Sequence, residues 1–415
     1  MDKTDKICPE GRDVVVYILP ILALQYVMGV LVQLKNTALL RIALLLLILW
    51  VILRALLALD FSCGQQDEGL KDAVFFTYMV VIVAQATVWA LARQPYRRDN
   101  VRVTGSTSIP MACWNVWDLL MNARGIGWNW SKGIPIPQSS IELQSRRRFL
   151  LFTVTRIIFF AIVFDAFIEA VGTHCPNPST RDIPTIFDRS LPPIARYFRV
   201  FQIVYLAFWL AYFTIEWVYQ LLSAICVVLF HQHPSQWPPL FDKPWLSTSL
   251  SDLWGRRWHQ ILRHLCVNLG GEPFASFLGR PGYVLGTFFL SGAFHYVGFR
   301  ATRCGGNFAI EGGFFVVNAI GVVFERVWSK MRGCRIRGVY GRIWTLSWVV
   351  LWSVPMVDKW ASIGLCGRDI FGGYRPAMSL LSLVLPTSVD KSFVANCLCF
   401  GISVSFLAYS LLTLP

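Results

Sequence analysis

Nine apolar segments divide the chain, and each is close to the length that crosses a lipid bilayer. A hydrocarbon core of about 30 Å needs about 20 apolar residues per helical span, and helices satisfy their own backbone hydrogen bonds in lipid. Only 15% of the 415 residues are charged, against about a quarter in soluble domains. We predict an all-α polytopic membrane protein with a single integral membrane domain over residues 1–415. The predicted spans are 14–34, 38–59, 73–92, 149–171, 200–230, 282–299, 313–328, 343–357 and 393–412.

Loop charges predict the orientation of these spans. The loop between Ala92 and Phe149 has nine Lys or Arg and three acids, and the one between Trp328 and Ile343 has five bases and no acid. With nine spans both loops fall on one side, which should be cytosolic. We therefore expect a cytosolic C-terminus, an N-terminus on the opposite side, and residence in the endoplasmic reticulum membrane. The one usable glycosylation sequon, at Asn129, then faces the cytosol and should stay unmodified.

Cysteine spacing and net charge exclude several other classes of protein. The eleven cysteines are scattered without a C-x-x-C pair, so we expect neither a zinc site nor a disulfide framework. The first apolar run lacks a small-residue cleavage site and is expected to stay as a helix. The net charge of +14 suits loops that face anionic lipid headgroups, so we do not expect nucleic acid as a partner.

The loop over residues 231–281 contains a pattern typical of an amphipathic helix. Ser249 with Asp252, or Ser251 itself, supplies an N-cap signal. We expect a cytosolic helix that lies in the membrane interface, with His259 on its flank. The apolar face would hold Trp254, Trp258, Ile261, Leu262, Leu265 and Leu269, and the polar face Asp252, Arg256, Gln260 and Arg263.

Polar side chains inside spans are costly in lipid and are therefore functional candidates. Arg41 and Arg54 lie near span ends, where long side chains reach the headgroups. Asp165 and Glu169 stand one turn apart, and we expect them to pair with a basic residue of another helix; a proton or ion pathway is the alternative. The full set is Arg41, Arg54, Arg156, Asp165, Glu169, Glu216, Glu325, Arg326 and His295.

His295 differs from the others in its depth and its neighbours. It follows Gly282 by 13 residues, so it would lie roughly 20 Å along its helix. Its neighbours one turn away include Ser291, Gly292 and Gly298, so it faces either a tightly packed helix or a cavity. It is either a buried neutral imidazole with a structural role or a base that removes a proton from an alcohol.

Metal-dependent membrane enzymes do not fit the histidine and aspartate content. Pairs occur at His231 and His233 and at His259 and His264, but the chain has six histidines and no two are adjacent. Di-iron hydroxylases need more histidine ligands, and membrane prenyltransferases need aspartate-rich motifs that are missing here. We therefore predict no metal and no resident cofactor.

Two motifs carry a resemblance to a known family. The stretches LWGRRWH at Leu253–His259 and FFLSGAFHYVG at Phe288–Gly298 resemble the signature of membrane-bound wax synthase domains, which are related to the membrane-bound O-acyltransferases. The signature region spans 249–299, and His259 stands where many relatives carry asparagine. The length and layout resemble fungal acetyltransferases that modify terpenoids and meroterpenoids in secondary metabolism.

The resemblance implies a reaction and a set of site residues. An acetyl group would pass from acetyl-CoA, a co-substrate, to a hydroxyl of a lipophilic alcohol that arrives through membrane lipid. His295 would be the general base, and His259 would help to stabilise the oxyanion or orient the CoA arm. Ser291, Gly292 and Gly298 would line the cavity around the base. The CoA side would hold Arg256, Arg257, Arg263 and Trp258.

Three alternatives stay open from the sequence. The first has the same chemistry with a longer acyl chain, as in a wax or sterol ester synthase. The second is a membrane transporter, against which stands the lack of an internal repeat between the halves. The third is a scaffold that has lost its catalytic activity.

Overall fold

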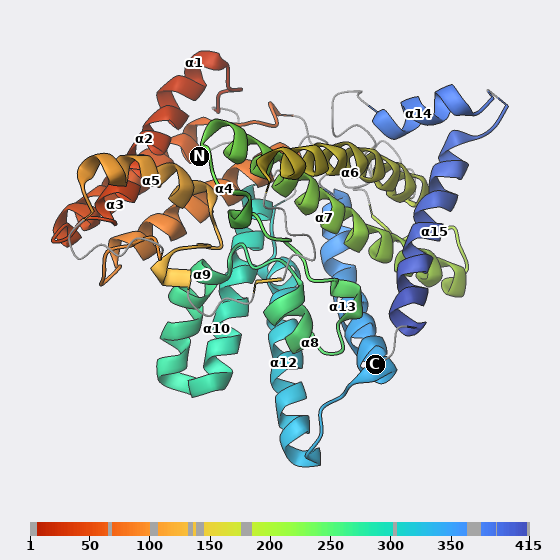
Figure 1. The fold of residues 1–415 in the computed structure, drawn as a ribbon. Helices are drawn as coiled ribbons and strands as arrows, with labels where there is room; N and C mark the ends of the chain where they lie inside the picture. Colours follow the sequence, from red (N-terminus) through yellow and green to blue (C-terminus); the bar gives the residue numbers. More distant parts are fainter. Residues whose placement is uncertain are drawn as a thin grey trace. The chain divides into compact units, whose positions relative to one another are not determined.

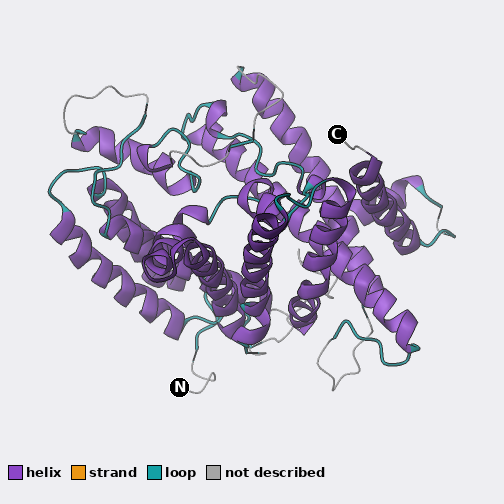
Figure 2. Cartoon of the chain, turned by 90° about the horizontal axis from the view of Figure 1, so that it is seen from below, coloured by secondary structure: helices purple, strands orange, loops and turns teal. Residues whose placement is uncertain are grey.

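The computed structural model describes residues 6–64, 69–99, 107–131, 136–137, 145–175, 185–301, 305–362, 375–386 and 388–412. Across these ranges the chain forms helices joined by loops, with two isolated bridges and no strand (Figure 2). The predicted all-α class is confirmed for this part of the chain. Some loop residues counted for the orientation, such as Arg102, Lys132 and Glu142, lie outside the described ranges.

The chain divides into two compact units. Unit 1 comprises residues 1–135 and 260–319, and unit 2 comprises residues 136–259 and 320–415; the single-domain assignment stays a prediction. The helices of unit 1 are α1 (Gly11–Asp13), η2 (Val14–Ile18), α2 (Leu19–Leu31), α3 (Ala38–Ala58), α4 (Gly69–Ala90), α5 (Ile109–Met121), η3 (Asn129–Ser131), α9 (Arg263–Cys266), η7 (Val267–Gly271), α10 (Glu272–Ala301) and α11 (Phe308–Glu311) (Figure 1).

Unit 2 holds the longest helix that the structure describes, α7. Helix α12 (Gly313–Arg332) begins in unit 1 and continues into unit 2. The other helices of unit 2 are α6 (Arg146–His174), α7 (Pro193–Leu229), η4 (Pro234–Gln236), η5 (Pro244–Leu246), α8 (Leu250–Asp252), η6 (Leu253–Arg257), α13 (Gly338–Trp360), α14 (Pro376–Val384) and α15 (Lys391–Leu412).

Six helical stretches within the described ranges are long and apolar enough to cross a membrane. Large apolar side chains on them face outward, such as Leu39 and Leu46 of α3, which are 84% and 64% exposed. Such exposure is expected of surfaces that meet lipid tails, and the chain is a multi-pass membrane protein. The six are Gly11–Leu31, Ala38–Ala58, Lys71–Ala90, Arg146–His174, Pro193–Leu229 and Phe308–Arg332.

Three predicted spans do not meet the same measure, so the count of nine is not confirmed. They fall in α10, α13 and α15, which are helical but interrupted, shorter or richer in polar residues. Helix α10 is also interrupted, because Gly279 has a non-helical backbone (φ 60°) and Pro281 follows it.

In unit 1, α4 packs between α3 and α10 around a core that includes Ile48, Met79 and Trp89. Arg41 is buried in this region, and its guanidinium donates to the backbone carbonyls of Trp89 and Ala92 at the end of α4. The last carbonyls of a helix have no partner within it. Arg41 therefore has a structural role, as expected, but it has this role through buried hydrogen bonds and not by reaching the headgroups.

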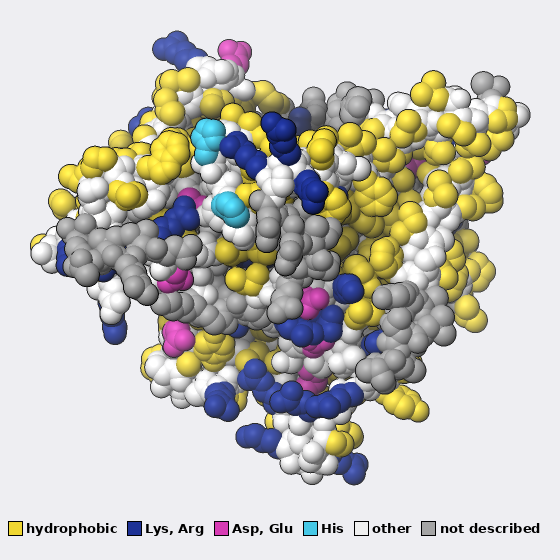
Figure 3. Space-filling view, viewed as in Figure 1, with side chains coloured by type: hydrophobic (Ala, Val, Ile, Leu, Met, Phe, Trp, Pro, Cys, Tyr) yellow, Lys and Arg dark blue, Asp and Glu magenta, His cyan; other side chains and the backbone are white. Residues whose placement is uncertain are grey.

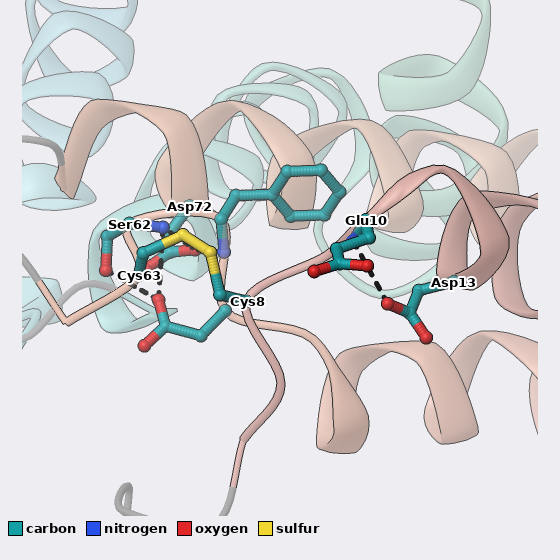
Figure 4. The surroundings of a disulfide bond; sticks show 8 residues. Cys8, Glu10, Asp13, Ser62, Cys63 and Asp72 are labelled. Atoms are coloured by element: carbon teal, nitrogen blue, oxygen red, sulfur yellow. Dashed lines mark hydrogen bonds between the residues drawn. A yellow bond between two sulfur atoms is a disulfide. The ribbon is translucent and has the colours of Figure 1, made fainter.

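A disulfide joins Cys8 to Cys63 in unit 1 (Figure 4). The backbone of Ile7 supports it by pairing with Ala58 and Asp60, and Asp72 accepts a hydrogen bond from the Phe61 amide at 2.8 Å. The expectation that the cysteines build no disulfide framework is therefore wrong for Cys8 and Cys63. The 55-residue separation hid the pairing, because only the α2–α3 hairpin brings the two ends together.

In unit 2, α6 packs along α7, and α14 and α15 pack against α6. Arg375, at the start of α14, donates to Asp165 at 2.5 Å and to Glu169 at 2.8 Å. The predicted pairing of these acids with a basic residue is confirmed. Figure 3 shows hydrophobic side chains along α6 and α15, and basic ones around the lower end of α12, whose last turn carries Lys330 and Arg332.

Candidate active site

The motif segment, which we define as residues 249–259 in unit 2, starts with the predicted cap. The hydroxyl of Ser249 accepts a hydrogen bond from the amide of Asp252 at 3.0 Å. Helix α8 continues directly into η6, where the turn widens until the Trp258 amide bonds to the carbonyl of Leu253 at 2.8 Å. The N-cap prediction is confirmed.

The sequence predicted one continuous helix from the motif segment to Leu269. The structure shows an interrupted one. Trp258 has an extended backbone (ψ 153°), and helix resumes only at Arg263. The break has a tertiary cause, because the Arg257 carbonyl accepts from the Asp242 amide at 2.9 Å. The Arg257 guanidinium in turn donates to the carbonyl of Asp242 at 3.0 Å.

The arginines proposed for CoA have different environments. Arg257 is only 14% exposed and its Nε lies 2.6 Å from Asp252, so it holds the segment together. Arg256 also approaches Asp252, at 3.2 Å, but its side chain is 51% exposed. Arg263 belongs to unit 1, where it donates to Gln260 at 3.0 Å. Of the three, Arg256 has the most surface available for a phosphate.

Aromatic rings surround Trp258 and His259 in unit 2. The Trp258 ring lies 4.9 Å from Phe241 and 5.3 Å from Phe208 of α7, centroid to centroid. The His259 ring lies 5.8 Å from Phe241 and 5.6 Å from Trp258. Both side chains are half-buried, so the end of the motif segment is held by ring contacts and not by its own helix.

In unit 1, α9, η7 and α10 form a helical hairpin that reverses at Gly279 (Figure 1). Its legs are residues 263–278 and 280–301. A Cβ on Gly270 would stand 2.2 Å from the carbonyl oxygen of Gly286, so the two backbones touch. The second leg, which carries His295, therefore packs against η7 and α9 of the first leg.

His295 lies on the second leg in a defined tautomeric state. Its Nδ1 is 2.8 Å from the carbonyl oxygen of Ser291. A carbonyl can only accept, so Nδ1 carries the proton and the neutral ring keeps its lone pair on Nε2. The ring packs on Phe315 at 4.3 Å, centroid to centroid. The arrangement leaves Nε2 as the proton-accepting atom.

The small residues near His295 mark helix contacts. A Cβ on Gly292 would meet the carbonyl of Gly312 at 2.9 Å, and one on Gly298 would meet Thr77 of α4 at 2.4 Å. Ser291 contributes its carbonyl to His295. The structure thus places both glycines against packed helices, which is one of the two predicted alternatives. Their position on the wall of a cavity stays a prediction.

Sequence reasoning did not identify the partners of His264 on the first leg. Its Nδ1 accepts from the Asn268 amide group at 3.1 Å, and its Nε2 lies 3.3 Å from the hydroxyl of Tyr96. The Trp130 ring lies 4.2 Å away, centroid to centroid. Burial lowers the pKa of His264 to about 4, so the ring is neutral at physiological pH. Asn268 is four residues along the same leg, whereas Tyr96 and Trp130 come from distant parts of the sequence, which no local pattern reveals.

No group of three or more His, Cys, Asp or Glu side chains with the spacing of a metal site occurs among the described residues. The absence of a metal stays a prediction.

Comparison with known sequences bears on this arrangement. Residues 237–317, which contain the motif segment and the hairpin, match the model of the membrane bound O-acyl transferase family. The resemblance to membrane-bound O-acyltransferases is confirmed. The matched acyltransferase region includes both His259 and His295.

Relatives of the chain fall into two groups, fungal transferases and plant long-chain-alcohol acyltransferases. Acetyltransferase ple2 of Rhodocybe pseudopiperita is 27% identical over 77% of this chain and 85% of its own length. O-Mevalon transferase macI of Penicillium terrestre is 23% identical over 79% of each chain. A probable long-chain-alcohol O-fatty-acyltransferase of Arabidopsis thaliana is 32% identical over 27% of this chain and 37% of its own.

Proposed function

We propose that this membrane-bound acyltransferase moves an acetyl group from acetyl-CoA to a hydroxyl of a lipophilic terpenoid or meroterpenoid alcohol. The observation that carries the proposal is the His295 imidazole, whose Nδ1–H is bound to the Ser291 carbonyl within the matched region. The extended similarity to fungal acetyltransferases favours acetyl as the transferred group.

The chain's own residues supply the proton transfers of this reaction. His295 Nε2 takes the hydroxyl proton as the alcohol oxygen attacks the thioester carbonyl. The tetrahedral intermediate then expels the CoA thiolate, which receives the proton from the imidazolium, so that an ester and free CoA leave. The Ser291 carbonyl keeps the ring oriented and stabilises its positive charge while the proton is held.

His259 and Arg256 have supporting roles in the proposal. His259, held by the rings of Phe241 and Trp258, would donate to the oxyanion or orient the pantetheine arm. The exposed guanidinium of Arg256 would bind a CoA phosphate, for which a planar fork of donors is suited.

The cysteines support the proposed orientation. The disulfide of Cys8 with Cys63 joins the N-terminus to the loop after α3, and Cys175, just after α6, is also disulfide-bonded. Disulfides persist in oxidising compartments, so these ends would face the lumen of the endoplasmic reticulum. Cys334, in the basic loop after α12, is free and exposed. That loop and the C-terminus would face the cytosol, where CoA is present.

The side chain of Asn129, in the sequon, is hydrogen-bonded within the fold. It accepts from the Arg97 amide at 3.0 Å and donates to the Pro95 carbonyl at 3.2 Å. A glycan on this amide would break the second bond. We therefore expect the sequon to be unmodified.

A long-chain ester synthase is the second candidate, because about a quarter of the chain is similar to plant long-chain-alcohol O-fatty-acyltransferases. Competition between acyl donors separates the two. Microsomes that contain the protein are incubated with labelled acetyl-CoA, a hydroxylated terpenoid and increasing palmitoyl-CoA. We expect acetyl transfer that palmitoyl-CoA does not displace. Preferential palmitoyl transfer would favour the ester synthase, and no transfer from either donor would contradict both.

A further inference from the structure

Glu325 of α12 binds three donors from two other segments of unit 2. Its Oε1 accepts from the Leu250 amide at 2.7 Å and from the Trp344 indole at 2.9 Å. Its Oε2 accepts from the Ser251 amide at 3.1 Å. Leu250 and Ser251 are the first two residues of α8, where amides lack partners within the helix. A carboxylate at this position is favoured by charge-assisted bonds and by the helix dipole.

The bonds to Glu325 fix one end of the helical part of the motif segment. Residues 250–257 run without interruption through α8 and η6. At the other end, Arg257 and Asp242 exchange backbone and side-chain bonds. Trp258 and His259 leave directly from that end. A shift at residue 250 is therefore transmitted through two helical turns to His259.

We propose that Glu325 is a positioning residue for acyl transfer, which sets the height and rotation of residues 250–257 and thereby the place of His259. The inference rests on the proposed function. Glu325 acts through backbone amides and touches no substrate. The Trp344 indole holds the carboxylate in the rotamer that meets both amides.

Amide exchange tests the contact without reference to any reaction. Glu325→Gln keeps the side-chain shape but replaces one acceptor oxygen by an NH₂ group, which cannot accept from an amide. A charge-assisted hydrogen bond slows the hydrogen exchange of the donating amide by about tenfold or more. The remaining oxygen can still accept from one amide, so we expect the Leu250 or Ser251 amide that faces the new NH₂ group to exchange at least about tenfold faster in the variant. The α13 amides should be unchanged. Wild-type exchange rates at both residues 250 and 251 would overturn the proposal.

Kinetics separate positioning from a purely structural role. In folded Glu325→Gln protein we expect the ratio kcat/KM for acetyl-CoA to fall by about tenfold or more, with partial recovery in Glu325→Asp. Arg326→Gln removes a charge from the next, exposed residue of α12 and should leave both constants unchanged. If Glu325→Gln only lowers the amount of folded protein and the remainder turns over normally, the positioning role is lost.

A double variant tests the link to Trp344. Trp344→Phe should accelerate the Leu250 amide in the wild-type background and have a smaller effect beside Glu325→Gln, because the two residues share one bond. Fully additive effects would contradict the rotamer argument. Absence of acyl transfer by the wild-type protein would contradict the proposed function alone. Faster amide exchange in Glu325→Gln would still support the contact of Glu325 with residues 250 and 251.

Discussion

Gly270 and Gly286 touch through their backbones, and each would place a Cβ within 2.3 Å of the other's carbonyl oxygen. This contact sets the register of the hairpin that carries His295. The added methyl group in Gly270→Ala or Gly286→Ala must push the two legs apart. Such overpacking lowers the free energy of unfolding by about 1–3 kcal/mol. We expect a lower unfolding temperature in detergent and a loss of transfer. Gly401→Ala, where no atom lies within 4 Å of the new Cβ, is the matched control.

His295→Asn should abolish transfer while preserving the fold. The asparagine NH₂ group can take the place of Nδ1 and donate to the Ser291 carbonyl, but no basic atom replaces Nε2. Loss of a general base costs about 10²–10⁴-fold in rate. Transfer is measured at equal amounts of folded protein, judged by gel filtration in detergent. Activity within tenfold of wild type would rule out the assignment of His295 as the base.

Acid should destabilise unit 1 through His264. Its pKa is about 4 in the folded protein because of burial, against about 6.5 unfolded. Between these values the unfolded chain binds the proton and the folded chain does not, so stability is lost as pH falls from about 6.5 to 4 and levels off below. For this half-buried ring we expect the free energy of unfolding to fall by about 2 kcal/mol over this pH range.

The measurement is the unfolding midpoint against pH for wild type and His264→Gln. The variant should show a flatter dependence between pH 4 and 6.5, and His233→Gln, at an exposed histidine, should follow the wild type. Identical curves for wild type and His264→Gln would show that this histidine does not titrate as described.

Cysteine labelling should distinguish the two sides of the membrane. In sealed microsomes a membrane-impermeant maleimide should modify the exposed thiol of Cys334. Cys8 and Cys63 should react only after the vesicles are opened and the disulfide is reduced. Cys334→Ser removes the first signal and serves as its control. Labelling of Cys8 in sealed vesicles would reverse the proposed orientation.

Arg375→Ala should destabilise unit 2, because it leaves Asp165 and Glu169 buried without their cation. Removal of one partner of a buried pair costs about 3–5 kcal/mol. Arg375→Lys should recover part of the loss, since one ammonium replaces a two-pronged guanidinium. Differential scanning fluorimetry in detergent measures both, and an unchanged midpoint in Arg375→Ala would contradict the role of this pair.

Local pattern was enough to predict the elements whose causes are local. The apolar runs predicted the helices, Ser249 was recognised as a cap from its position before Asp252, and the depth and small neighbours of His295 indicated its helix. The Asp165 and Glu169 pair was expected to find a cation, although its source in Arg375 could not be foreseen across 206 residues or more.

The missed features depend on contacts between distant residues. The break at Trp258 follows from backbone bonds to Asp242, while the hydrophobic pattern continues across it. The reversal at Gly279 had a local signal in Gly279 and Pro281, but residues 270–281 were assigned to a loop. The carboxylate of Glu325 was recognised as unusual, whereas its donors at residues 250 and 251 emerged only from the fold.

The Cys8–Cys63 bond also bears on how the chain is made. In the proposed orientation it would close only after α2 and α3 have entered the membrane as a hairpin with both outer ends on the oxidising side. A chain that inserted its first helix backwards would then leave Cys8 in the cytosol, away from Cys63. Under that orientation the bond would be a covalent record that the first two spans were inserted correctly.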